Sequence, residues 1–146
     1  MAVRQSHNLD NTVRARGDRG RDLETLIVEV KKLFSYCAPD CRKYLVVVPD
    51  AAQVNDFYLH NMEQLGARFA RAEDLHQADY PFLARLRQGL AGEPIAILNP
   101  LPRLQAEEAR GRRLYYANDT HLNRTGQALL GQYVLERLQA DGLASR

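Results

Sequence analysis

The chain has 146 residues, of which 45% are hydrophobic and 26% charged, a balance typical of one globular domain or of part of one. Twenty Lys and Arg against 18 Asp and Glu give a net charge of +2, so we expect no nucleic-acid partner. No apolar run reaches the ~18 residues of a membrane span, and the first residues lack the apolar stretch of a signal peptide. The compartment stays open: cytoplasmic for the chain as given, envelope if it is N-terminally truncated.

Residues 1–20 are predicted to form a basic, poorly ordered amino-terminal arm or the remnant of an earlier block. Four arginines lie close together at the end of this stretch and just after it, Arg14, Arg16, Arg19 and Arg21. Such a cluster can bind phosphates, but no aromatic side chains alternate with it, which favours a solvated arm. Residues 21–142 are predicted to form the C-terminal part of an α/β domain.

Helices and strands alternate along that second stretch. The apolar side chains that predict a helix over residues 21–34 are Leu23, Ile27, Val30 and Phe34, with Leu26 and Leu33 widening the stripe. Further helices are predicted over residues 51–67, 79–92, 101–111 and 124–140. Two short apolar runs, at 43–49 and 93–100, look like strands buried on both faces of a parallel sheet. We therefore predict an α/β fold in which residues 43–48 and 95–98 are parallel neighbours or near neighbours in one sheet, with helices on both faces.

Two strands are few for four or five amphipathic helices, because parallel sheets are normally covered by helices on both faces. The pattern predicts either that a partner supplies strands or that the chain is the later part of a larger domain; we favour the larger domain. An exposed apolar sheet edge would then permit association.

Cys37 and Cys41 lie in a short segment that contains a proline. This spacing permits a disulfide across a turn, but loop thiols in a reduced cytosol are the favoured interpretation. A metal site would need two further ligands, and no Cys or His pair at matching spacing occurs, so no metal is predicted. His60 and His76 are likewise interpreted as surface or core-edge residues.

The segment YYANDTHLNRTGQALL, residues 115–130, places Asp119 and His121 two positions apart on a short polar turn. Side chains at this spacing on extended backbone point the same way, so the carboxylate can orient the imidazole and raise its basicity, as a general base requires. The alternative is a polar turn in which Asn123 or Thr125 caps the next helix.

The run LYYANDTHLNRTGQALLGQYVLERL resembles the last conserved block of the SGNH (GDSL-type) hydrolases, where an Asp and a His precede a C-terminal helix. KYLVVVPDAAQV is similar to their penultimate strand and IAILNPLPRLQAEEARG to their final strand and helix. The resemblance spans roughly residues 20–140 and implies a partial three-layer α/β/α domain of flavodoxin-like, SGNH type with a short parallel sheet. It assigns catalytic roles to Asp119 and His121.

The nucleophile block of this family, a serine in a Gly-Asp-Ser turn, is absent. The serines of the chain are Ser6, Ser35 and Ser145, and none follows a strand in a tight turn. By resemblance to another family block, Asn8 in QSHNLDN is a candidate for binding the oxyanion.

The resemblance implies an ester hydrolase that uses a Ser-His-Asp triad, here truncated and inactive alone, with no cofactor and no metal. Its substrate would be a small acyl ester or an acetylated sugar. Two alternatives stay open: an O-acyltransferase of envelope polysaccharide on the same scaffold, and a non-catalytic α/β module.

Overall fold

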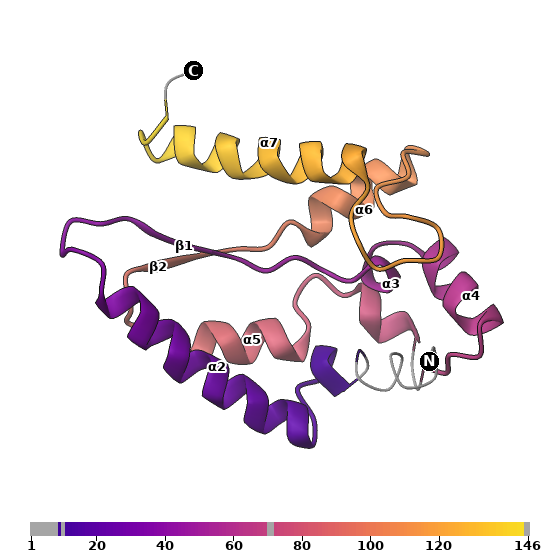
Figure 1. The fold of residues 1–146 in the computed structure, drawn as a ribbon, viewed down its shortest axis with the longest axis horizontal. Helices are drawn as coiled ribbons and strands as arrows, with labels where there is room; N and C mark the ends of the chain where they lie inside the picture. The colour runs from indigo at the N-terminus through magenta and orange to yellow at the C-terminus, as the bar shows by residue number, and fades with distance from the viewer. Residues whose placement is uncertain (1–8, 10, 70–71, 145–146) are drawn as a thin grey trace. The chain divides into compact units, whose positions relative to one another are not determined.

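The computed structural model describes residues 9, 11–69 and 72–144, as a mixture of helices and a short parallel sheet (Figure 1). The elements in chain order are α2 (Asp18–Ser35), β1 (Lys43–Val46), α3 (Ala51–Val54), α4 (Asp56–Gln64), the 3-10 helix η1 (Ala72–His76), α5 (Pro81–Gly89), β2 (Ile95–Leu98), α6 (Leu101–Ala109) and α7 (Arg124–Ala140). No described helix is both long and apolar enough to cross a membrane.

The sheet consists of β1 and β2, hydrogen-bonded to each other and parallel. The pairing extends past β1, where the Val47 amide donates to the Leu98 carbonyl at 3.0 Å. The predicted pairing of residues 43–48 with 95–98 is therefore confirmed. The predicted burial on both faces is wrong: all four residues of β1 are half-buried, and Leu98 is the one buried residue of β2. A sheet of two strands leaves each strand with an unpaired edge in the described chain.

The chain divides into two compact units, and the first comprises residues 1–45 and 62–97. In it α2 packs against α5, with Leu23 and Val30 of α2 buried. The two helices approach closely because Gly89 has no side chain: a Cβ there would meet Ile27 Cδ1 at 2.5 Å. The Arg85 guanidinium reaches from α5 to the Ala15 carbonyl at 2.9 Å.

Two expectations for this unit need correction. Leu26 and Leu33 do not widen the buried stripe of α2, since their side chains are 42% and 65% exposed. Arg14 does not belong to a solvated arm, because its side chain is 7% exposed and forms an ion pair with Asp74 at 2.6 Å. Arg19 and Arg21 form ion pairs with neighbours on the exposed surface of α2 itself. The ion pair with Asp74 is what allows the charge of Arg14 to be buried, because a charged group in such a position needs a partner.

The second unit comprises residues 46–61 and 98–146. In it α3 packs against α6, and the Gln105 side-chain amide donates to the Gln53 carbonyl at 2.9 Å. The continuous helix predicted over residues 51–67 is wrong. Asn55 is extended (φ −156°, ψ 138°) and separates α3 from α4. Its Oδ1 accepts from the Phe57 amide at 2.9 Å, which caps the new helix and explains the break.

Cys37 and Cys41 lie in the loop between α2 and β1 and form a disulfide, with their Cα atoms 5.9 Å apart. The favoured interpretation of these residues as free thiols is therefore wrong, and the alternative that the spacing permitted is the one present. The separation lies within the range that a disulfide requires.

Candidate active site

The segment between α6 and α7 folds back on itself as a short hairpin. We call it the catalytic loop (residues 114–123) after the role that we propose for it below. Its two arms are joined by an antiparallel bridge between Tyr115 and Leu122. Two further backbone bonds close it, from the Tyr116 amide to the His121 carbonyl at 3.2 Å and from the Asn123 amide to the Leu114 carbonyl at 2.9 Å. The polar turn that the sequence predicts is therefore an ordered hairpin.

Asp119 and His121 lie at the tip of the catalytic loop and contact each other. Asp119 Oδ1 accepts a hydrogen bond from His121 Nδ1 and a second from the His121 backbone amide, the latter at 3.0 Å. The pairing of a side-chain oxygen with the amide two residues on is an Asx turn. The two side chains therefore meet because the backbone turns, whereas the sequence suggested that extended backbone would align them.

The contact fixes the chemistry that this pair can perform. The hydrogen bond from His121, the largest cause, holds the pKa of the Asp119 carboxyl below its usual range. Because Nδ1 faces the carboxylate, Nε2 is the ring nitrogen left to take a proton. The His121 side chain is 81% exposed and the Asp119 side chain 52%, so Nε2 is reachable from solution.

Asn123 ends the catalytic loop and begins α7. Its Oδ1 accepts from the Gly126 amide at 3.0 Å, so it is the N-cap that the sequence proposed. Its side-chain amide also donates to the Arg113 carbonyl at 2.8 Å. The first turn of α7 lies directly against the loop, because a Cβ at Gly126 would come within 2.1 Å of the Leu114 carbonyl oxygen. One asparagine and one glycine thus join the loop to the helix.

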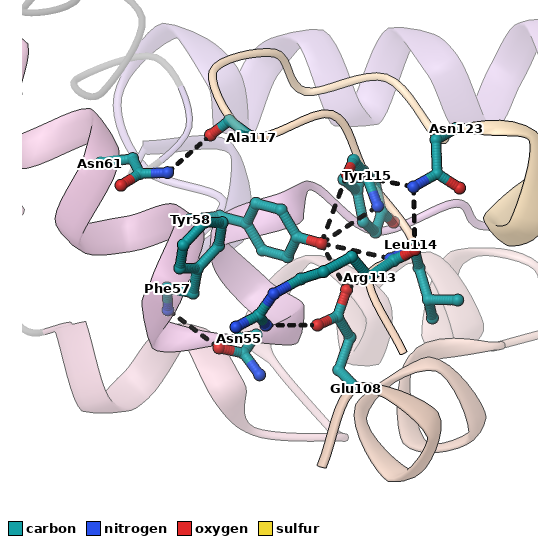
Figure 2. A network of polar contacts seen from close by, with 10 residues as sticks. All are labelled: Asn55, Phe57, Tyr58, Asn61, Glu108, Arg113, Leu114, Tyr115, Ala117 and Asn123. Atoms are coloured by element: carbon teal, nitrogen blue, oxygen red, sulfur yellow. Dashed lines mark hydrogen bonds and ion pairs between the residues drawn. The ribbon is translucent and has the colours of Figure 1, made fainter. Parts of the chain in front are cut away.

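A buried polar network holds the other end of the loop (Figure 2). The Tyr58 hydroxyl, from α4, donates to Glu108 Oε1, from α6. It accepts in turn from the Leu114 amide at 3.2 Å and from the Tyr115 amide at 3.1 Å. Glu108 Oε1 also accepts from the Leu114 amide at 2.7 Å. The first two peptide groups of the loop are therefore bound by side chains of two helices.

The charge of Glu108 is balanced at the same place. Its side chain is fully buried, and Oε2 accepts from the Arg113 guanidinium at 2.8 Å. Arg113 itself lies over the ring of Phe57, 4.1 Å from its centre, a cation–π arrangement. Burial, followed by the hydrogen bond with Glu108, raises the pKa of Tyr58 to about 12, so the hydroxyl keeps its proton at neutral pH.

Sequence reasoning did not identify Tyr58, Glu108 and Arg113. One signal was present: Glu108 occupies the position four residues after Leu104 and seven after Leu101, on the buried stripe of α6. A carboxylate at such a position needs buried partners. The sequence does not identify Tyr58 as one of them, because Tyr58 comes from α4, 50 positions away in the chain.

The sequence also singled out Asn8, three serines and His60. Asn8, the oxyanion candidate, lies outside the described residues, as do Ser6 and Ser145. Ser35 ends α2, and its hydroxyl donates to the Lys32 carbonyl at 2.7 Å, so it is a helix-terminal residue. His60 is exposed on α4. Within the described ranges no group of three or more His, Cys, Asp or Glu gathers as a metal site would require.

Comparisons with protein-family models, with curated proteins and with solved structures found no match to this chain. The resemblance to the SGNH hydrolases therefore rests on the residues themselves, chiefly on Asp119, His121 and the cap that follows them. The family, like the flavodoxin-like layering that it implies, stays a prediction.

Proposed function

We propose that Asp119 and His121 form the general-base pair of an acyl-transfer site of SGNH type. The observation that carries the proposal is the contact of Asp119 with His121 Nδ1, which leaves Nε2 free and solvent-accessible. In this mechanism Nε2 takes the proton of a serine hydroxyl as the oxygen attacks an ester carbonyl. Asp119 orients the imidazole and stabilises its charged form. Nε2 then passes the proton to the leaving alcohol as the ester C–O bond breaks, which leaves an acyl-serine. Water, deprotonated by Nε2, attacks this ester, the acid is released, and the serine recovers its proton.

Ser35 is the one serine among the described residues, and its local contacts give it no nucleophilic role. Ser35 is a helix-terminal residue on α2, in the first unit, and its hydroxyl is bonded to the chain. The proposal therefore requires a hydroxyl from outside the described chain. No metal or organic cofactor takes part in this mechanism, which needs only a nucleophile, a base and donors for the oxyanion.

The substrate class follows from the resemblance alone: a small acyl ester or an acetylated sugar. A sugar hydroxyl in place of water as the acyl acceptor would make the same pair an O-acyltransferase of polysaccharide. Association through an exposed apolar edge also belongs to this proposal. It is supported by the half-buried strands and by the exposed Leu26 and Leu33.

A second candidate function, a non-catalytic α/β module, has an observation in its favour. Asp119 accepts from the His121 backbone amide as well as from the ring, and Asn123 caps α7. Both features would stabilise a turn that does no chemistry.

The test compares histidine variants in a form of the protein that carries the serine block of the family. We expect His121→Ala to abolish hydrolysis of a nitrophenyl ester, because the hydroxyl loses its base. His60→Ala, which removes an exposed imidazole from the same unit, should leave turnover within a few-fold of the parent. The chain of 146 residues alone should show no burst of acyl-enzyme.

Normal turnover in a folded His121→Ala protein would contradict the proposal and favour the non-catalytic module. A burst from the chain alone would overturn the requirement for an external hydroxyl. Ser6→Ala and Ser145→Ala would then locate the nucleophile.

A further inference from the structure

The contacts at the tip of the catalytic loop do not by themselves fix Asp119 and His121. Both side chains are mostly exposed, and in the described chain the tip is held mainly by short-range bonds within residues 116–121. Among the described residues, one bond from outside reaches this part of the loop, from the Asn61 side-chain amide to the Ala117 carbonyl at 2.8 Å. An exposed turn with so few anchors depends on the geometry of the arms from which it grows.

The arm that enters the loop is held from α4 and α6. The Tyr58 hydroxyl has one hydrogen and two lone pairs, and all are used: the hydrogen on Glu108, the lone pairs on the amides of Leu114 and Tyr115. Glu108 Oε1 takes a second bond from the Leu114 amide. Figure 2 shows the hydroxyl at the centre of these bonds.

The arm that leaves the loop is tied to the first one. Asn123 donates to the carbonyls of Arg113 and Tyr115, at 2.8 and 3.2 Å, while its Oδ1 caps α7. A displacement of Leu114 and Tyr115 in the entering arm would therefore also displace Asn123 in the leaving arm. The network is buried, where polar groups without partners are costly, so it has one favourable arrangement.

We propose that Tyr58 and Glu108 are positioning residues that hold the entering arm of the catalytic loop where its tip brings Asp119 and His121 into contact. The importance of this contact for catalysis rests on the proposed function. The positioning itself is a property of the fold and can be measured without a substrate.

The test follows the titration of the Asp119 carboxyl by carbon NMR in the full chain, as the pH is lowered while the amide spectrum reports that the protein stays folded. In the parent the hydrogen bond from His121 holds the pKa of Asp119 below its usual range. We expect Tyr58→Phe to raise the Asp119 midpoint toward that of an ordinary aspartate. His121→Ala, which removes the ring but keeps the backbone amides, gives the part of the shift that the ring supplies.

Tyr133→Phe is the matched control. It removes a tyrosine hydroxyl from the same unit, one that donates to the Asn99 carbonyl at 3.1 Å and not to the catalytic loop. A purely structural loss would act alike in both variants, whereas positioning predicts a shift of the Asp119 midpoint in Tyr58→Phe alone. An unchanged midpoint in folded Tyr58→Phe would overturn the proposal.

Glu108→Gln provides a second route if Tyr58→Phe does not fold. Glutamine keeps the size of the side chain but replaces one carboxylate oxygen with an NH₂ group. This donor would face another donor, either the Leu114 amide or the Arg113 guanidinium. We expect the Asp119 midpoint to rise here too, and an unchanged midpoint would refute the positioning role. If the midpoints shift but His121→Ala keeps normal turnover, the proposed function fails and the positioning stands.

Discussion

Asp119 accepts two hydrogen bonds from His121, one from its backbone and one from its ring. The sequence could predict this contact because the two residues are close in the chain and their chemistry is complementary. It could not predict the Asx turn that produces it, nor the side chains that support the loop from α4 and α6. The contacts of Tyr58 join residues 50 or more positions apart, such as Tyr58 and Glu108. The catalytic role of the pair stays a prediction.

The buried hydroxyl of Tyr58 makes the free energy of unfolding depend on pH in the alkaline range. Its pKa in the folded protein is raised to about 12, from 10.0 for an ordinary tyrosine, first by burial and then by Glu108. The unfolded chain therefore releases this proton at lower pH than the folded one. The stabilisation is fully present below pH 10 and is lost as the pH rises from about 10 to about 12.

We therefore expect the urea midpoint to fall over that interval, and Tyr58→Phe to make the fall shallower. The fall should not vanish, because burial also raises the pKa of Tyr115. At pH 7 the variant should be less stable by about 1–3 kcal/mol, since groups of the network lose a partner. A fall as steep as that of the parent would show that Tyr58 does not contribute to it.

At the scale of the elements, periodicity predicted α6, α7 and both strands close to their observed positions. The helix over residues 51–67 was predicted wrongly because the local chemistry of Asn55, whose side chain caps α4, overrides the helical pattern around it. The burial of the strands was also wrong. An apolar run indicates that a strand is able to be buried. How far it is buried depends on how many strands and helices pack against it.

The junction between the catalytic loop and α7 is testable with two glycines of one helix. A Cβ at Gly126 would lie 2.1 Å from the Leu114 carbonyl oxygen, while one at Gly131 would meet nothing within 4 Å. Gly126→Ala should therefore lower the free energy of unfolding by about 1–3 kcal/mol. Gly131→Ala should raise it by roughly 0.5–1 kcal/mol, because alanine favours the helix.

Both variants are measured by chemical denaturation at neutral pH. The opposite signs are the expected result, since the substitution is the same and only the surroundings differ. If Gly126→Ala were as stable as Gly131→Ala, the close approach of α7 to the loop would be disproved.

At the scale of the whole molecule, the sequence indicated α/β character and the parallel pairing of β1 with β2, and both are present. It also indicated more apolar helix surface than two strands can cover. In agreement, only Gly126 and Leu129 are buried among the residues of α7. The flavodoxin-like layering and the serine block lie beyond what this pattern can establish, because both depend on strands that the described residues do not contain.

The central claim, that Asp119 and His121 act together as a base, is tested most directly by the turnover of Asp119→Asn in a form of the protein that carries the serine block. The substitution keeps the shape of the side chain and removes its charge, and in triads such a loss reaches roughly 10⁴-fold in rate. We expect a loss of that order, with Asp40→Asn, at an exposed aspartate, within a few-fold of the parent. Turnover in folded Asp119→Asn equal to that of Asp40→Asn would contradict the account.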